Sequence, residues 1–347
     1  MKAAIFHGVG KALAIEEIAI PEPQQHEVVL KVGRCGICSS DVAMTSGQGW
    51  TYAAGLSLGH EYAGEVVALG PGVERLRIGD RITAMPMSGC GRCASCLAGR
   101  PMSCANGMRM MMGGYGEFTL ADERFAIRLP ASLSLADGAL VEPLAAALHG
   151  VAMAPLRCGE SVVVLGAGPI GVGAIYWARR LGAGRVVASA RSSRRAGLAF
   201  AMGATAFLKV EDLPAALPDT LRGLPDIVLE CTGAPGVLAQ AIDLVRPGGT
   251  IVCLGVCSLA DSFVPATASY KEVCVRFACA YNLADFRFAV DTLDRGAVEP
   301  RAMVETTVGL NAVPELLEDM RAGHSHGAKI LVAPHGAPPF AQGEDHG

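Results

Sequence analysis

A buried strand that runs directly into a glycine-rich loop is the feature that most constrains this chain. Residues 162–166 read VVVLG, a continuous apolar run typical of a strand covered on both faces. Glycines 166, 168 and 171 follow in the spacing G-x-G-x-x-G, and residues 170–181 have a helical pattern. A strand, a tight turn and a helix in this order predict a site that binds a dinucleotide.

Each glycine of this loop has a physical task. Gly166 permits the tight turn, Gly168 lets the backbone approach a pyrophosphate, and Gly171 lets the helix pack closely on the strand. The helix N-terminus offers unpaired N–H groups to the phosphates. We therefore predict that the cofactor contacts the loop and the first helical residues, namely Gly166, Gly168, Pro169, Ile170 and Gly171. The alternative is an ordinary strand-to-helix turn, in a chain with 43 glycines.

The residues about 20 positions further on select the nucleotide. An NAD site has Asp or Glu there to bind the ribose hydroxyls, whereas residues 189–195 read SARSSRR and contain no acid. Arginines match a 2′-phosphate, so this segment favours NADP(H) over NAD. The predicted contacts, with Arg191 the main one, are Ser189, Arg191, Ser192 and Arg195. Whether Arg194 or Arg195 shares the phosphate stays open, and a solvated basic turn is the alternative reading.

The hydrophobic pattern divides the chain into two textures. Up to about residue 143, short alternating strands are separated by Gly, Pro and Asp, which indicates an antiparallel, barrel-like part. From residue 159, apolar strands alternate with helices, which indicates a doubly wound parallel sheet of the Rossmann type. After residue 281 the pattern becomes irregular and ends in KILVAP at 329–334. The fold class is therefore α/β.

Composition excludes several classes of protein. The chain has 347 residues, enough for about two domains, and 51% of them are hydrophobic. A net charge of −4 gives no reason to expect binding to nucleic acid or to a membrane. Residues 1–23 lack the continuous apolar core that a signal peptide has, and there is no run of 18 apolar residues, so we expect neither a signal peptide nor a transmembrane helix. With 12 cysteines and no export signal, we expect a cytoplasmic protein whose thiols stay reduced or bind metal.

Four cysteines form a local metal-binding pattern. Cys90, Cys93, Cys96 and Cys104 have the spacing C-x2-C-x2-C-x7-C on a glycine-rich loop. Four thiolates can complete a tetrahedral zinc site with no open position, which is typical of a structural site. Disulfides, or four unrelated thiols, are the alternatives.

A second group of possible ligands is scattered along the chain. Cys38, His60, Glu61 and Glu142 have no local spacing that links them. One thiolate, one imidazole and carboxylates form a mixed ligand set that leaves a position for water or substrate, as a catalytic zinc requires. A structural His–Glu pair is the alternative.

Several motifs together resemble the zinc-dependent medium-chain dehydrogenase/reductase family, which includes the alcohol and polyol dehydrogenases. The resemblance covers residues 1–334 and rests on CGICSSD, GHEYAGEV, GDRI, the four-cysteine loop, VEPLAAALHG, VLGAGPIG and ECTGAPG, in the family's order. It implies a GroES-like catalytic domain at 1–147, a Rossmann domain at 148–281 and a return to the catalytic domain at 282–334. Residues 335–347 are expected to form a mobile tail.

The resemblance also implies roles for individual residues. Cys38 and His60 bind a catalytic zinc, with Glu61 beside it as a carboxylate that ligates the metal or moves toward it. Glu142 takes the third-ligand position, where simple alcohol dehydrogenases have Cys, and this favours the sorbitol and threonine dehydrogenase branch. With the four-cysteine site, the chain would hold two zinc ions. Ser40 passes the proton outward, but Ala43 stands where many relatives have a relay histidine.

These features predict hydride transfer between NADP(H) and a secondary alcohol, diol or polyol, or the corresponding carbonyl compound. The family resemblance implies a homodimer or homotetramer. By resemblance Asp41 orients the histidine ligand. Side chains of the substrate pocket are expected around residues 46–56, including Trp50, and at Tyr115 and Asn282, and the other cysteines are expected to pack in apolar regions. The alternatives are a zinc-free NADPH quinone or enoyl reductase and a non-catalytic NADPH-binding protein.

Overall fold

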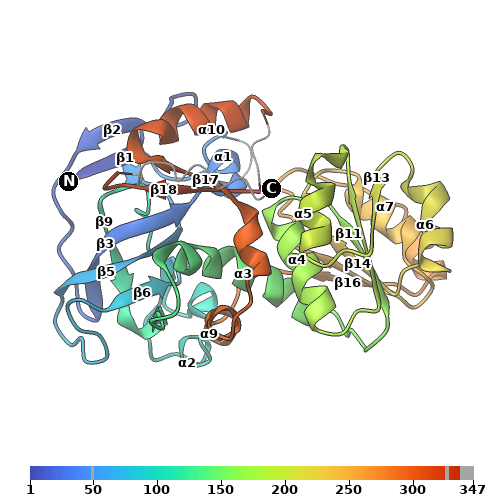
Figure 1. Ribbon diagram of the computed structural model, residues 1–347, viewed down its shortest axis with the longest axis horizontal. Helices are drawn as coiled ribbons and strands as arrows, with labels where there is room; N and C mark the ends of the chain where they lie inside the picture. The colour runs from blue at the N-terminus through green and yellow to red at the C-terminus, as the bar shows by residue number, and fades with distance from the viewer. Residues whose placement is uncertain (48–50, 325–327, 337–347) are drawn as a thin grey trace, which may run out of the picture.

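A computed structural model describes residues 1–47, 51–324 and 328–336 of the chain. A strand-rich part and a part with a parallel sheet lie side by side, and α3 (Leu135–Met153) and α9 (Leu283–Asp294) lie where the two meet (Figure 1). Trp50 and the tail beyond residue 336, on which two of the sequence expectations fall, lie outside the described residues.

The strand-rich part is built on one mainly antiparallel sheet in the order β10-β6-β5-β3-β18-β17, with β9 also paired to β3. Its strands are β3 (Glu27–Gly36), β5 (Glu61–Leu69), β6 (Arg81–Ala84), β9 (Phe118–Asp122), β10 (Ala126–Arg128), β17 (Val304–Gly309) and β18 (Lys329–Ala333). Two smaller sheets join β1 (Lys2–Phe6) to β2 (Ala14–Glu17) and β4 (Leu56–Ser57), and β7 (Met87–Ser88) to β8 (Arg109–Met110). The short helices here are α1 (Ser39–Ala43), α2 (Ala94–Leu97) and α10 (Val313–Arg321).

The second part is a parallel sheet in the order β13-β12-β11-β14-β15-β16, the doubly wound arrangement of a Rossmann fold. Its strands are β11 (Ser161–Leu165), β12 (Arg185–Ala190), β13 (Ala206–Lys209), β14 (Ile227–Glu230), β15 (Thr250–Cys253) and β16 (Cys274–Phe277). Its helices are α4 (Pro169–Arg180), α5 (Ala196–Ala201), α6 (Leu213–Leu221), α7 (Val237–Leu244) and α8 (Pro265–Tyr270). The fold class predicted from the sequence is confirmed.

Single 3₁₀ turns connect several of these elements. They are η1 (Pro101–Ser103), η2 (Glu123–Phe125), η3 (Ser193–Arg195), η4 (Glu299–Met303) and η5 (Leu310–Ala312).

The apolar run that opened the sequence argument is the centre of the parallel sheet. In β11, Val163 and Val164 point to opposite faces, and both are fully buried because helices cover the two sides.

The sequence pattern did not predict β13, α6 or β16. The expected boundary at residue 148 falls inside α3, and β17 and β18 pair within the first sheet although they follow the second part. The division into domains stays a proposal, with α3 shared by both parts.

Helix α3 is the core helix between the two parts. Among the described helices it is the one long and apolar enough to cross a membrane, with mean hydropathy 1.2, yet 67% of that stretch is buried inside the protein. It begins with a capping box in which the Ser134 hydroxyl accepts from the Asp137 backbone N–H and the Asp137 carboxylate accepts from the Ser134 backbone N–H. Arg301 also donates to the Asp137 carboxylate, at 2.7 Å, and ties the returning chain to this helix.

Burial raises the pKa of Asp137, but hydrogen bonds from Arg301 and Ser134 lower it more, so the pKa lies below its ordinary value. We expect Asp137→Ala to reduce the free energy of unfolding by about 1–2 kcal/mol at pH 7. A lowered carboxyl pKa stabilises the fold above the unfolded value of about 3.9, and this stabilisation is lost as the pH falls through the folded value. Urea unfolding of the wild type and of Asp137→Ala, at neutral and at acidic pH, measures this effect. The difference between their free energies of unfolding should become smaller as the pH falls. The exposed Asp219→Ala is the control, and a difference independent of pH would contradict the linkage.

Candidate metal centre and cofactor site

The pairing of β3 with β5 assembles the first candidate centre. The register places Gly36, at the end of β3, opposite Glu61, at the start of β5. Cys38 lies two residues after the end of β3 and is the N-cap residue of α1, while His60 immediately precedes β5. Ligand atoms of Cys38, His60 and Glu61 consequently lie within 4.8 Å of one another. Three of the four scattered candidates are thus brought together.

Asp41 and Tyr115 hold the histidine of this group from behind. The His60 Nδ1 atom lies 3.2 Å from Asp41 Oδ1, and the Tyr115 hydroxyl donates to Asp41 Oδ2 at 2.6 Å. Asp41 and Tyr115 are fully buried. A carboxylate at Nδ1 leaves the Nε2 atom of His60 to face the centre, as in the carboxylate–histidine pairs of metal sites. Tyr115 was expected to line the pocket, and this expectation is wrong because its side chain is enclosed and bonded to Asp41.

Lys329 is a member of the centre that the sequence analysis missed. Its ammonium donates to both oxygens of Glu61 at 2.6 Å and to the Ile37 carbonyl at 3.1 Å. Lys329 and Glu61 are almost completely buried. Burial alone would lower the pKa of Lys329, but the Glu61 carboxylate raises it more, so the lysine stays charged. The sequence does contain a signal for this role, which is a lysine at the start of the apolar segment KILVA. A charged residue in a strand that is buried on both faces requires a partner of opposite charge.

Glu142 lies close to this group without joining it. It projects from the middle of α3, and its carboxylate is not among the ligand atoms that lie within 4.8 Å of one another. Burial, with a further contribution from Glu61, raises the pKa of Glu142 to about 7, while His60 and Lys329 oppose the shift.

Tyr52, from the segment expected to form the pocket, also faces the centre. Burial, followed by the charge of Asp41, raises its pKa well above the usual value. Asn282 has a different role from the one expected, because it caps α9, where its side chain accepts from the Asp285 backbone N–H.

The chemistry of this group fits a zinc ion. The centre contains more acidic groups than basic ones. Its acidic groups are the carboxyls of Asp41, Glu61 and Glu142 and the Cys38 thiol. Lys329 and His60 are the basic groups that interact with them among the described residues. Such an acid-rich, largely buried group is costly unless a cation compensates it. A thiolate, an imidazole and a carboxylate are the donors that zinc prefers, and three protein ligands leave an open position.

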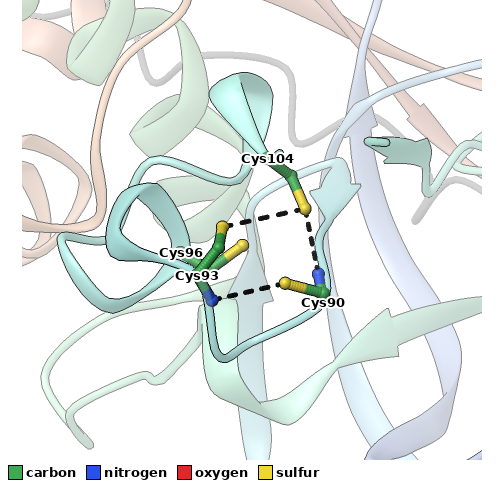
Figure 2. A group of neighbouring side chains, drawn as sticks. All are labelled: Cys90, Cys93, Cys96 and Cys104. Atoms are coloured by element: carbon green, nitrogen blue, oxygen red, sulfur yellow. Dashed lines mark hydrogen bonds between the residues drawn. The ribbon is translucent and has the colours of Figure 1, made fainter. Parts of the chain in front are cut away.

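The four cysteines of the loop converge as their spacing predicts (Figure 2). All four Sγ atoms lie within 4.8 Å of one another, and Cys93 Sγ is 4.0 Å from Cys104 Sγ. A tetrahedron with Zn–S bonds of about 2.3 Å has S···S edges of about 3.8 Å, so a zinc ion fits between them. None of the four is in a disulfide. A Cβ atom at Gly89 would lie 2.5 Å from Cys96 Sγ, so the cradle requires glycine there.

The dinucleotide loop has the conformation that its glycines allow. Gly166 has φ +100°, and Gly168 is the N-cap residue of α4 with Pro169 in the first turn. A Cβ atom at position 171 would lie 1.8 Å from the Gly166 carbonyl oxygen, so strand and helix can approach only with glycine there. Ile170 lies in the same first turn and is half-buried.

A second loop supports the dinucleotide loop from beside it. The buried Glu230 carboxylate accepts from the backbone N–H groups of Thr232 and Gly233, at 2.6 and 3.0 Å. A Cβ atom at Gly166 would lie 2.7 Å from Thr232 Cγ2, so the two loops are in contact.

The basic turn follows β12 directly beside this loop. Arg191 and Ser192 are exposed, whereas Arg195 is half-buried and donates from Nη1 to the Ala167 carbonyl at 3.1 Å. Ser189 is fully buried, its carbonyl accepts the Gly166 N–H at 2.8 Å, and its hydroxyl lacks a hydrogen-bond partner among the described residues. The predicted cofactor contacts therefore surround one loop, and Ser189 lies beneath it.

The remaining cysteines divide into two groups. Cys35 and Cys253 are buried and Cys231 is half-buried, as expected for packing residues. The expectation is wrong for the four that are exposed, which are Cys158, Cys257, Cys274 and Cys279. Cys158 lies in a turn, Cys257 and Cys279 lie in loops, and Cys274 lies in the edge strand β16, where apolar neighbours in sequence do not imply burial.

The close approach of β3 to Glu61 provides a test of this geometry. A Cβ atom at position 36 would lie 1.9 Å from Glu61 Oε2 and 3.1 Å from Lys329 Cδ. Since breaking a buried ion pair costs about 3–5 kcal/mol, we expect Gly36→Ala to lower the free energy of unfolding by a similar amount. Gly309→Ala, in β17 of the same sheet, is the matched control because nothing lies within 4 Å of its added Cβ. Equal stability of the two variants in denaturant titrations would show that the ion pair of Glu61 and Lys329 does not require glycine at position 36.

Comparisons with known proteins match the chain to two family models and to curated relatives. The family model of the alcohol dehydrogenase GroES-like domain matches residues 24–131, and that of the zinc-binding dehydrogenase matches residues 169–295. The Aspergillus clavatus protein named Probable D-xylulose reductase A is 32% identical, with 92% of each chain covered. Sorbitol dehydrogenase of Bacillus subtilis is 29% identical, covering 96% of this chain and 98% of that protein.

Solved structures are similar over almost the whole chain. A zinc-binding dehydrogenase from Sinorhizobium meliloti 1021, described as bound to NADP, has a TM-score of 0.85 and 32% identity, covering 96% of this chain and 99% of that chain. The 2R,3R-butanediol dehydrogenase of Bacillus subtilis has a TM-score of 0.85 and 29% identity, with the same coverage. With both family models matched in order and relatives aligned over nine-tenths of its length, the chain belongs to the zinc-type alcohol and polyol dehydrogenase family of oxidoreductases.

Proposed function

We propose that this protein transfers a hydride between NADP(H) and a secondary alcohol, diol or polyol, or the corresponding carbonyl compound, with the help of a bound zinc ion. The observation that carries the proposal is the convergence of ligand atoms from Cys38, His60 and Glu61 in an acid-rich, largely buried centre. The donor set is that of a zinc site with an open position, which a substrate oxygen can occupy.

In this proposal the chain holds two zinc ions. Cys38 and His60 hold the catalytic ion with Glu61 or Glu142, and Cys90, Cys93, Cys96 and Cys104 hold the structural ion. When bound, the catalytic zinc would supply Lewis acidity toward the substrate oxygen, and NADP(H) would donate or accept the hydride. Glu61 is held by Lys329 in this structure, so its ligation requires it to exchange part of that ion pair for the metal.

Ser40 is the first group that can move the substrate proton. Its hydroxyl lies 3.2 Å from Cys38 Sγ and 3.4 Å from His60 Nε2, at the edge of the centre. Position 43, at the end of α1, is an exposed alanine and offers no imidazole to continue a relay. We therefore assign the outward step to Ser40 and solvent, with Glu142 as the nearby carboxylate of raised pKa.

The preference for NADP(H) rests on the basic turn after β12. Arg191 and Ser192 are exposed beside the dinucleotide loop, and no acidic residue occurs in 189–195. The Arg195 guanidinium is already directed to this loop through the Ala167 carbonyl. The NADP bound to the Sinorhizobium meliloti dehydrogenase supports the same choice.

The substrate class rests on the relatives. Proteins named as acting on xylulose, sorbitol and 2R,3R-butanediol are similar over more than nine-tenths of the chain. All three names describe secondary alcohols with a neighbouring oxygen, or their ketones. We therefore infer a vicinal diol, polyol or hydroxyketone as the substrate class.

We further propose a homodimer or homotetramer that works in the cytoplasm. Strand β16 is an edge of the parallel sheet, and its Phe277 is 69% exposed. Val264 and Tyr270, in or beside α8, are 66% and 90% exposed. An uncovered apolar edge of this kind is suited to pairing with a second copy of the chain.

The role of zinc is tested by Cys38→Ser. We expect NADP-dependent oxidation of a polyol and diol panel, followed by absorbance of NADPH, to fall by more than ~100-fold. Cofactor binding and thermal stability of the variant should change little. Removal of zinc from the wild type with a chelator should produce the same loss of activity. The exposed Cys158→Ser is the control. Full activity of Cys38→Ser, or resistance to chelation, would instead favour a zinc-free reductase. Cofactor binding without any turnover would favour a binding protein.

The cofactor preference is tested by Arg191→Ala. Loss of a charged hydrogen bond to the 2′-phosphate should weaken NADPH binding by about 10- to 100-fold and leave NADH binding nearly unchanged. Fluorescence titration with the two cofactors measures this difference. Arg180→Ala, at the far end of α4, controls for loss of a surface charge. Equal weakening of both cofactors would remove Arg191 from the phosphate site.

A further inference from the structure

Residues 281–285 include the end of the connection from the parallel sheet and the first turn of α9, and they contact helix α3 at two places. Asp285 Oδ2 lies 2.7 Å from His149 Nδ1, and Tyr281 faces Glu142. Positions 142 and 149 are seven residues apart, which is about two helical turns, so they lie on one face of α3. The same short segment therefore contacts that face near the metal centre and again two turns away.

The Tyr281 side chain is enclosed, but its hydroxyl is not satisfied. The residue is 3% exposed, and its ring stacks on Phe286 with centroids 5.5 Å apart. The hydroxyl oxygen is buried and has no hydrogen bond of normal geometry in the described residues. The carboxylate of Glu142, on the facing side of α3, is the neighbouring group that interacts with this hydroxyl. A buried hydroxyl without a partner is costly, and the nearby carboxylate is the acceptor that would satisfy it.

The backbone around Tyr281 fixes its position. Ala280 has φ +54°, a conformation that non-glycine residues rarely adopt and that surrounding contacts must maintain. Asn282 closes a capping box with Asp285 at the start of α9. The backbone N–H of Leu283 donates to the Gly99 carbonyl, at 2.9 Å, in the loop that carries the four cysteines. Tyr281 is thus anchored on both sides and is no freely moving surface group.

We propose that Tyr281 is a positioning residue for Glu142: its hydroxyl donates to the Glu142 carboxylate and sets the orientation in which that carboxylate faces Cys38 and His60. This inference rests on the proposed zinc-dependent function and adds to it a residue outside the set of ligands. Hydrogen bonds to ligating side chains orient them, and losing one typically costs 10- to 100-fold in metal affinity or activity.

The test is Tyr281→Phe, which keeps the ring stacked on Phe286 and removes only the hydroxyl. The chelated protein is titrated with Zn²⁺ and, separately, with Co²⁺, whose visible absorption reports the ligand geometry. We expect the Kd of the mixed-ligand site to rise about 10-fold and its Co²⁺ spectrum to change, while the four-cysteine site and NADPH binding stay as in the wild type. Tyr176→Phe is the matched control, because its hydroxyl is also buried without a partner but lies in α4.

A double-mutant cycle decides whether the effect passes through Glu142. In a Glu142→Gln background, Tyr281→Phe should produce no comparable loss of affinity. An unchanged Kd in Tyr281→Phe, or an equal loss with and without the Glu142 carboxylate, would overturn the proposal. Thermal unfolding checks that each variant is folded, and His149→Asn tests the second contact of the segment, which should alter stability but not the Co²⁺ spectrum. Because metal binding is measured directly, this result is independent of whether the expected substrates are turned over.

Discussion

The buried ion pair between Glu61 and Lys329 is the interaction on which the candidate metal centre depends. It joins the start of β5 to the start of β18, across the glycine that ends β3. Without Lys329, the centre would keep several acidic groups and lose the lysine that partly compensates them. With it, the charge of Glu61 is balanced by the protein, while the carboxylates of Asp41, behind His60, and of Glu142 remain close to the converging ligand atoms. A residual negative charge, enclosed and incompletely balanced, favours a divalent cation.

Much of the fold and of the local sites could be predicted from the sequence because the relevant signals are local. The buried strand and glycines of 162–171 determine one turn, and the cysteines at 90–104 determine one loop. Glu61, placed in the catalytic set by resemblance, does come together with Cys38 and His60. The contacts of Tyr115, Tyr281 and Lys329 at the centre could not be predicted because they join residues 74 or more positions apart, and no spacing rule reports such pairs. The missed strands β13 and β16 are short and flank the sheet, where burial and hence hydrophobic pattern are weak.

Helix α3 relates the two parts of the molecule to each other. Its first turn is tied to Arg301 of the returning chain, its middle carries Glu142, and its last turns meet Asp285 through His149. Helix α4, which begins at the dinucleotide loop, packs against it, and the Trp177 indole donates to the Leu144 carbonyl at 2.8 Å. A shift of either part against the other must therefore be accommodated along this one helix, close to the candidate ligand Glu142.

The position of Lys329 so near the C-terminal end has a consequence for biogenesis. Domains generally fold from the N-terminus during synthesis, so β3 and β5 can pair while most of the chain is still unmade. Glu61 would then be enclosed with no ammonium to compensate it until β18 is inserted beside β3. Maturation of the centre must accordingly wait for the final strand. A nascent chain truncated before residue 329 would retain its glycine loop and four-cysteine loop but lack the completed mixed-ligand centre.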